Sequence, residues 1–192
     1  DLYQGPDDPA LAADLDRAET EAKALEADFR GHLAGLTGDR LAELVRRYEA
    51  VSETLGRAYA FASLRFAAQR DDAEVGRFFQ GIQERVNGIT TPLLFVTLEL
   101  NRLEEADLEA RIADSAALAH YRPWLRDVRA FRPHQLSDEA EKLLHEKAVA
   151  GRSAWIRLFD ETLADLRFDV GGDRLTSAQV FDKLQDRDRT VR

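Results

Sequence analysis

The sequence predicts an all-α protein of long antiparallel helical hairpins with coiled-coil-like packing, plus one short β-hairpin near residues 166–176. Three observations support this prediction. Apolar residues recur every three or four positions over long stretches, which is the period of one helix face. Only 11 glycines and 5 prolines interrupt 192 residues. One alternating run surrounds a glycine pair, a pattern typical of a strand–turn–strand unit.

The first two predicted helices form a hairpin. Asp8 and Pro9 mark the start of the first helix, with an acid at the cap and a proline in the first turn, and we expect this helix to end near Gly35. Thr37 should cap the second helix, which reaches Phe66. So short a link makes the two helices antiparallel neighbours. Their apolar faces are Leu11, Leu15, Ala18, Ala22, Leu25, Phe29 and Leu33, then Leu41, Leu44, Val45, Tyr48, Val51, Leu55, Ala62 and Phe66.

A third long helix should open at Asp71 and Asp72 and run to Leu100. Pro92 lies inside it, and proline lacks an N–H and presses on the carbonyl four residues back, that of Gly88. We therefore expect a kink between Gly88 and Pro92 rather than two helices.

The next stretch, from Glu104 to Asp114, is polar and is expected to be a short helix or a linker. We place the main boundary here: residues 1–103 form a long-helix bundle, and residues 104–192 form a smaller helical lobe, truncated at its C-terminus. A fourth main helix should span residues 116–131, with its aromatic and aliphatic residues mostly inward. These are Tyr121, Trp124, Leu125, Val128 and Phe131.

The segment from Phe131 to Phe168 is predicted to be a tight helical hairpin. Ser137 suits an N-cap, Gly151 suits a helix stop, and Ser153 restarts the chain. The second arm has one apolar face, formed by Trp155, Leu158, Phe159, Thr162, Leu163 and Leu166.

The short β-hairpin is predicted from two alternating runs that flank Gly171, Gly172 and Asp173. Thr176 and Gln179 then have the spacing of a capping box and should begin a last helix.

Composition narrows the classes of function. The net charge of -9 opposes nucleic-acid binding, which depends on excess Lys and Arg. No apolar run approaches the roughly 20 residues of a membrane span. There is no cysteine, which excludes disulfides and thiolate metal sites in this chain. There is also no methionine, so we expect an excised piece of a longer protein.

No catalytic or zinc-binding residue is predicted, and the substrate-binding residues stay unknown. His145 and Glu146 begin the zincin pattern His-Glu-x-x-His, in which two imidazoles one turn apart bind zinc. The position of the second histidine is Val149. A helical histidine beside an exposed glutamate is the more ordinary interpretation. His32, His120 and His134 stand alone in the sequence.

Four arginines form a basic stripe on the fourth predicted helix. Two interpretations are open: an anion-binding surface, or ion pairs with an acidic neighbour in a chain that carries 36 acids. The arginines are Arg122, Arg126, Arg129 and Arg132. The paired acids suit helix starts rather than a catalytic dyad. These pairs are Asp7 and Asp8, Asp71 and Asp72, and Glu104 and Glu105.

Three strings carry a family resemblance. SDEAEKLLHEKAVAGRSAWIRLFDE, LAHYRPWLRDVRAFRPHQLS just before it, and DLYQGPDDPALAADLDRA at the start resemble the N-terminal region of oligoendopeptidase F. That family is a branch of the thimet-oligopeptidase-like zinc metallopeptidases.

The resemblance implies a cytoplasmic parent protein that cleaves short peptides. In that family, His-Glu-x-x-His and a downstream glutamate hold zinc in a C-terminal catalytic region, and helical regions enclose a substrate channel. The partners implied are this C-terminal region and short peptides, with no nucleic acid and no membrane. The zinc is implied for the parent protein and not for this chain.

Two hypotheses of function follow. In the first, this chain is the helical N-terminal portion of such a peptidase, not catalytic alone, which helps to enclose the channel. The alternative is a free-standing helical interaction module whose long hairpin binds a partner helix. The first predicts an exposed apolar patch larger than the few hundred Å² usual for a monomer.

Overall fold

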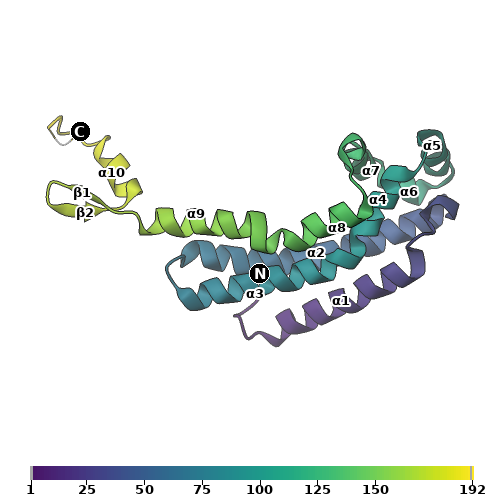
Figure 1. The fold of residues 1–192 in the computed structure, drawn as a ribbon, viewed down its shortest axis with the longest axis horizontal. Coiled ribbons are helices and arrows are strands. Elements are labelled where there is room, and N and C mark those ends of the chain that lie inside the picture. Colours follow the sequence, from purple (N-terminus) through teal and green to yellow (C-terminus); the bar gives the residue numbers. More distant parts are fainter. Residues whose placement is uncertain (1, 191) are drawn as a thin grey trace.

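A computed structural model describes residues 2–190 and 192, and it confirms an all-α protein with one small β-hairpin (Figure 1). The α-helices are α1 (Pro9–Phe29), α2 (Gly38–Ala68), α3 (Ala73–Thr90), α4 (Leu94–Arg102), α5 (Glu105–Asp114), α6 (Ala116–His120), α7 (Arg122–Arg129), α8 (Asp138–Lys147), α9 (Ala154–Asp165) and α10 (Ser177–Lys183). The strands are β1 (Phe168–Val170) and β2 (Asp173–Leu175).

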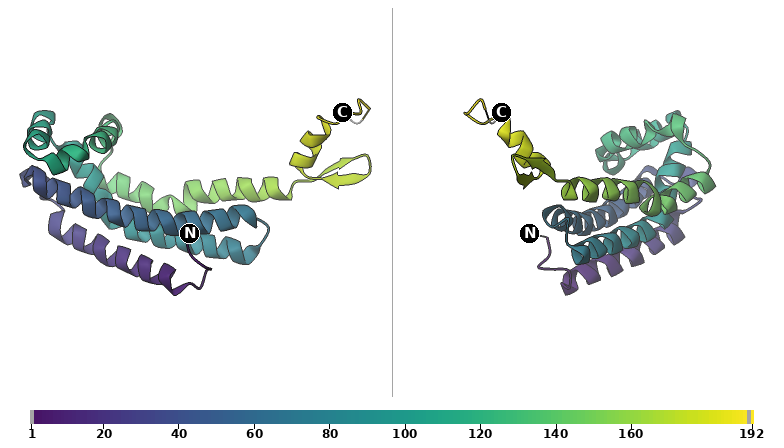
Figure 2. Two further views of the ribbon diagram at one scale, coloured as in Figure 1. Left: turned by 180° about the vertical axis from the view of Figure 1, so that it is seen from behind. Right: turned by 60° about the vertical axis from the view of Figure 1, so that its left-hand side comes forward.

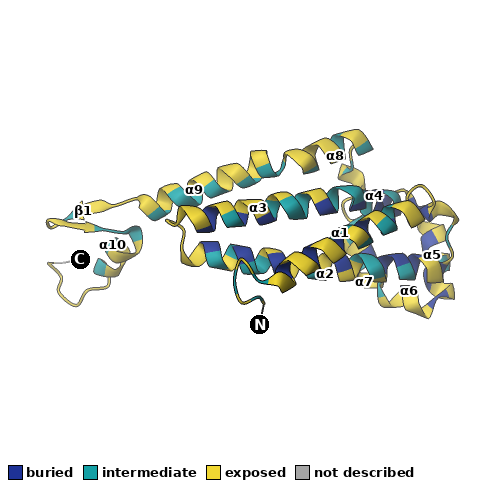
Figure 3. Ribbon diagram, turned by 90° about the horizontal axis from the view of Figure 1, so that it is seen from below, coloured by how far each residue is buried: buried dark blue, intermediate teal, exposed yellow. Residues whose placement is uncertain are grey.

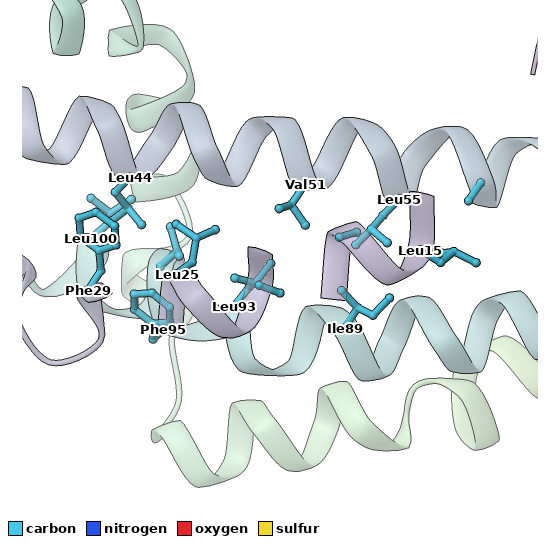
Figure 4. Packing of buried hydrophobic residues seen from close by; sticks show 14 of the residues in the cluster. Leu15, Leu25, Phe29, Leu44, Val51, Leu55, Ile89, Leu93, Phe95 and Leu100 are labelled. Carbon is cyan, nitrogen blue, oxygen red and sulfur yellow. The ribbon is translucent and has the colours of Figure 1, made fainter. Parts of the chain in front are cut away.

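The body of the molecule is a bundle in which α1, α2 and α3 run side by side (Figures 1 and 3). Each helix begins at a side-chain cap: Asp8, Thr37 and Asp72 accept backbone N–H groups of the first turn. Their apolar stripes meet in one core, to which α4 contributes Phe95 and Leu100 (Figure 4). The predicted antiparallel hairpin of α1 and α2 is therefore confirmed.

The first helix ends earlier than predicted. It stops at Phe29, because Gly31 turns the chain with a φ of +80°, a conformation that glycine adopts without strain. The Glu99 carboxylate on α4 holds this turn, accepting the N–H of Gly31 at 2.7 Å. Leu33–Gly35 is a separate 3₁₀ turn. Contacts between helices far apart in the sequence fix this end.

The prediction of one kinked third helix is also wrong. A 3₁₀ turn at Thr91–Leu93 separates α3 from α4, so the chain forms two helices. Pro92 lacks the N–H that would bond to the carbonyl four residues back, that of Gly88, so the backbone ladder is interrupted there. Two threonine hydroxyls bond to carbonyls just before this point. Thr91 Oγ1 donates to the Asn87 carbonyl at 2.8 Å, and Thr90 Oγ1 donates to the Val86 carbonyl at 2.9 Å.

The polar stretch from Glu104 to Asp114 is a helix, α5, but the predicted fourth helix is divided. Tyr121 (φ −88°, ψ 4°) separates α6 from α7, because Pro123 in the first turn of α7 cannot donate a hydrogen bond back. Phe131, expected inward, is 69% exposed. The boundary between residues 103 and 104 stays a prediction.

The helical hairpin predicted for residues 131–168 does not form. The chain continues from α8 through a π-helical turn, Val149–Ser153, into α9 in one general direction (Figures 1 and 2). The N–H of Ser153 reaches the Ala148 carbonyl at 2.9 Å, so hydrogen bonding continues across the turn. Gly151 does not have a positive φ, so it does not end the helix.

The predicted β-hairpin is confirmed. Strands β1 and β2 pair antiparallel, and both turn residues, Gly171 and Gly172, have a positive φ. Thr176 and Gln179 form the predicted capping box at the start of α10. Together β1, β2 and α10 form an arm that stands away from the bundle (Figures 1 and 2).

A tight junction joins the start of α2 to the end of α5. Arg111 donates to the carbonyls of Leu33 and Ala34, and Ser115 Oγ donates to Asp39 at 2.6 Å. The backbone approach is so close that a Cβ on Gly38 would lie 2.7 Å from the Cβ of Ser115.

We predict that Gly38→Ala lowers the free energy of unfolding by about 2 kcal/mol, because the new methyl group overlaps the backbone of α5. Urea unfolding measures this change. Gly56→Ala is the control: Gly56 is an exposed α2 residue with no atom near its Cβ position, and the change should raise stability by about 1 kcal/mol. An equal change in the free energy of unfolding at both sites would contradict the close contact of Gly38 with α5.

The N-terminal segment is anchored by a phenol–carboxylate hydrogen bond. The Tyr3 hydroxyl donates to the buried Asp14 at 2.8 Å. This bond lowers the pKa of Asp14, and Arg17 lowers it further. Burial, together with Asp14, raises the pKa of Tyr3 to about 12.

We predict that Tyr3→Phe costs about 1 kcal/mol at neutral pH through the lost hydrogen bond. The pKa of Asp14 is lower in the folded protein than its ordinary value of 3.8. This stabilisation is therefore fully present above pH 3.8 and is lost as the pH falls through the folded-state pKa. Urea unfolding at pH 7 and pH 3 measures the difference. Tyr59→Phe is the control, since its hydroxyl accepts from Gln83 rather than binding a carboxylate. A Tyr3→Phe difference that persists undiminished at pH 3 would refute the coupling.

Candidate functional site

His145 lies in a contact between helices. Its Nε2 is 3.0 Å from Thr90 Oγ1 and 3.3 Å from the Asn87 carbonyl oxygen, while the Asn87 side chain donates to the His145 carbonyl at 2.8 Å. A carbonyl only accepts, so its contact with Nε2 requires a proton on that nitrogen. Glu146 pairs with Lys142 on the same helix at 3.7 Å. This histidine joins α8 to α3.

The described residues contain no group of three or more His, Asp or Glu side chains placed to hold a metal ion. His32, His120 and His134 lie on separate elements: before the first 3₁₀ turn, on α6 and in the turn after α7. The expectation that this chain carries no catalytic residue stays a prediction.

Ion pairing accounts for the arginine stripe. Arg122 meets Glu109 at 2.7 Å, Arg129 meets Glu105 at 2.6 Å, and Arg126 and Arg132 contact Asp127 and Glu104. Arg129, whose side chain is 7% exposed, also donates to the carbonyls of Leu100 and Leu103, so it ties α7 to the end of α4. The sequence left two interpretations of this stripe open, and the structure shows the second: ion pairs with acidic residues.

The most distinctive surface is an apolar face on α9, which we call the α9 face. Trp155 is 71% exposed and Phe159 is 62% exposed. The α9 face consists of the exposed residues Trp155, Ile156, Leu158, Phe159, Leu163 and Leu166. The sequence predicted most of these residues as one apolar face of the second arm of a hairpin. The hairpin does not form, since α8 and α9 lie end to end (Figure 3), and these residues are exposed.

The opposite side of α9, which faces the bundle, is charged. Arg157 donates to Gln80 at 2.7 Å, and its guanidinium lies 6.0 Å from the centre of the Phe66 ring. Asp160 meets Arg70 at 3.2 Å. The helix therefore turns its charges toward its own bundle and its aromatic side chains toward solvent. This is the reverse of a surface helix in a globular protein.

Further exposed apolar residues lie on both sides of the α9 face along the chain. They are Leu143 and Leu144 on α8, Phe168 on β1, and Phe181 and Leu184 on or next to α10. A large contiguous apolar patch is typical of a site of protein association. None of the described helices is long and apolar enough to cross a membrane. The fold and this surface define a helical protein with an exposed apolar face.

Comparisons with known proteins agree on one family. A family model described as Oligopeptidase F matches residues 99–168, from α4 to the first strand. The oligopeptidase PepF of Bacillus subtilis (strain 168) is 27% identical over 175 residues, covering 85% of this chain and 25% of that protein.

A solved structure shares the fold. The crystal structure of oligoendopeptidase-F from Enterococcus faecium superposes with a TM-score of 0.75 at 16% identity, over 95% of this chain and 37% of that one. The resemblance to the N-terminal region of oligoendopeptidase F is confirmed. This chain spans a quarter of the length of the curated relative.

We predict that the double variant Trp155→Gln, Phe159→Gln changes the free energy of unfolding by no more than about 0.5 kcal/mol, because both side chains are already exposed. Urea unfolding measures this. Leu44→Ala, in the buried core, is the reference and should cost about 3 kcal/mol. A loss in the double variant as large as that of Leu44→Ala would show that the α9 face supports the fold.

Proposed function

We propose that this chain is the N-terminal helical portion of an oligoendopeptidase F-type zinc peptidase that hydrolyses short peptides. Its role in that protein is to pack against the catalytic region and to help enclose the substrate channel. Support comes from the relatives, which match nearly all of this chain with only a quarter to 37% of their own length. The cytoplasmic location implied by the resemblance belongs to the same proposal.

The observation that carries the proposal is the reversed polarity of α9. An exposed Trp or Phe gains roughly 1.5–3 kcal/mol when it is fully buried, so the α9 face is a large potential source of association energy. The charged side of the same helix already has partners in the bundle, at Gln80 and Arg70. A protein surface that covers the α9 face would leave these contacts in place.

The arm adds a second surface to this interface. Strands β1 and β2 and helix α10 stand beyond the end of the bundle (Figures 1 and 2). Phe181 on α10 is exposed, like Trp155 on α9. A catalytic region that contacts both would be bordered on one side by helices, which suits a wall that limits access to short peptides.

Zinc belongs to the proposed parent protein. The described residues offer no ligand set for it, so we derive no catalytic step from this chain. The proposal assigns the metal and the water-activating glutamate to the catalytic region, in line with the family pattern His-Glu-x-x-His.

The alternative function, a free-standing module whose long hairpin binds a partner helix, has less support. The apolar seam between α1 and α2 is already covered by α3 and by the 3₁₀ turn Thr91–Leu93. Leu15, Leu55 and Ile89 meet inside this seam (Figure 4). The free apolar surface lies on α9 instead.

A chimeric enzyme tests the proposal. We predict that this chain, fused in place of the matching segment of the Bacillus subtilis oligopeptidase, gives hydrolysis of a short fluorogenic peptide, and that a zinc chelator abolishes it. The remainder of that enzyme without the segment should be inactive, because its substrate channel is open and its interface uncovered. A chimera whose parts fold but neither associate nor cleave peptides would count against the proposal.

Paired variants locate the interface in that chimera. Trp155→Asp with Phe159→Asp should lower activity at least tenfold, because charge at an apolar interface prevents association. Leu64→Asp is the matched control: Leu64 is an exposed leucine two residues before Phe66, hence on the opposite side of α2 from α9. An equal loss of activity in both variants would contradict the assignment of the α9 face to the interface.

A further inference from the structure

The π-helical turn Val149–Ser153 determines which side of α9 faces the bundle. In a continuous α-helix, the N–H of Arg152 would bond to the Ala148 carbonyl, four residues back. Here the N–H of Ser153 makes that bond, at 2.9 Å. The turn therefore contains one extra residue, and each residue of α9 takes the place that the residue before it would have in a continuous helix. One residue corresponds to a rotation of about 100°, so the turn rotates α9 by that angle.

The places that face the bundle hold polar or small residues in this register. The half-buried residues at these places are Ser153, Arg157, Asp160, Glu161 and Ala164. Without the extra residue, the same places would be held by Arg152, Ile156, Phe159, Asp160 and Leu163. Three of these five belong to the α9 face. A continuous helix would therefore turn apolar residues toward the bundle, as surface helices of globular proteins do.

The helix before the turn is anchored, and the segment after α9 is free to follow a rotation. The Asn87 side chain donates to the His145 carbonyl at 2.8 Å, and His145 Nε2 lies 3.0 Å from Thr90 Oγ1, so α8 is held on α3. The arm at the other end of α9 stands away from the bundle (Figures 1 and 2). A change of register in the turn would thus rotate α9 and the arm, while α8 stays in place.

Polar contacts hold α9 in the present register. Arg157 donates to Gln80 at 2.7 Å, and Asp160 meets Arg70 at 3.2 Å. No described residue of α9 is buried, and a cleft of about 350 Å³ stays open between α3 and this side of α9. Partly exposed ion pairs contribute little to stability, whereas apolar side chains at the same places would gain from burial. Each register gains what the other loses: polar contacts in one, apolar burial in the other.

We propose that the π-helical turn is a register switch for α9. With the extra residue in the turn, the α9 face is exposed and available to a protein partner. When that residue passes to the arm end of α9, the helix moves by about 1.5 Å along its axis and about 100° around it. Ile156, Phe159 and Leu163 then lie against the bundle, and part of the α9 face is covered while no partner is bound. This inference deepens the proposed function and rests on it only for the identity of the partner.

Two cysteine reporters on neighbouring positions test the switch, since the chain has no cysteine of its own. Leu163 is 45% exposed and Ala164 is half-buried, so Leu163→Cys should react with a maleimide faster than Ala164→Cys. Deletion of Gly151 removes the extra residue from the turn. It should slow the reaction at position 163 and speed it at position 164, each by roughly threefold or more, because the two positions exchange surroundings. An unchanged order, or faster reaction at both positions, would overturn the proposal.

A second pair of variants tests the switch without shortening the chain. Arg157→Ala with Asp160→Ala removes the polar contacts of the present register, so the two reaction rates should shift in the same opposite directions, by a smaller factor. Lys142→Ala with Glu146→Ala is the matched control, since it removes an ion pair of α8, before the turn, and should leave both rates unchanged. The absence of a shift in the first pair, or an equal shift in both pairs, would contradict the switch.

The chimeric enzyme separates this inference from the proposed function. Deletion of Gly151 in the chimera should lower peptide hydrolysis at least tenfold, because the α9 face no longer points toward the catalytic region. A reversed order of cysteine reaction in the isolated chain, with full activity in the chimera, would support the register switch and contradict the α9 face as the interface. An unchanged order in the isolated chain would contradict the switch and leave the proposed function standing.

Discussion

The buried face of α2 is the constraint on which the rest of the structure depends. This 31-residue helix carries ten buried residues from Gly38 to Phe66, and α1, α3 and α6 all pack on it. Its N-terminal end is held by the close approach of Gly38 to α5, and its C-terminal end by the stacking of Phe66 on Phe79. Since α2 is fixed at both ends, the helices that pack on it also have defined positions. Helices α8 and α9 then lie on the outside of α3.

Local signals in the sequence predicted this fold well, and signals that depend on distant contacts did not. The caps at Thr37, Ser137 and Thr176 and the glycine turn of the β-hairpin act within a few residues, so they can be read directly. The stop after Phe29 depends on Glu99, nearly 70 residues away. Gly151 permits a helix stop without requiring one, and the chain continued through a π-helical turn.

The α9 face illustrates a second limit of periodicity. A stripe of apolar residues shows that one side of a helix is made to be buried, but not by which surface. The predicted hairpin was wrong because Gly151 does not end the helix. The structure shows the charged side of α9 against the bundle and the apolar side free, and this polarity follows from Arg157 and Asp160, whose partners Gln80 and Arg70 are not adjacent in sequence. An exposed apolar face is thus present at the residues whose spacing predicted one, and a patch larger than a few hundred Å² stays a prediction.

The α9 face suits one kind of binding. It is aliphatic or aromatic and has no buried polar group without a partner among the described residues, so it suits an interface in which buried area supplies the energy. The contacts that hold the helices together lie elsewhere. The guanidinium of Arg129 joins α7 to the end of α4, and Arg157 and Asp160 hold the charged side of α9 against the bundle. A protein that covered the α9 face would therefore leave these contacts in place.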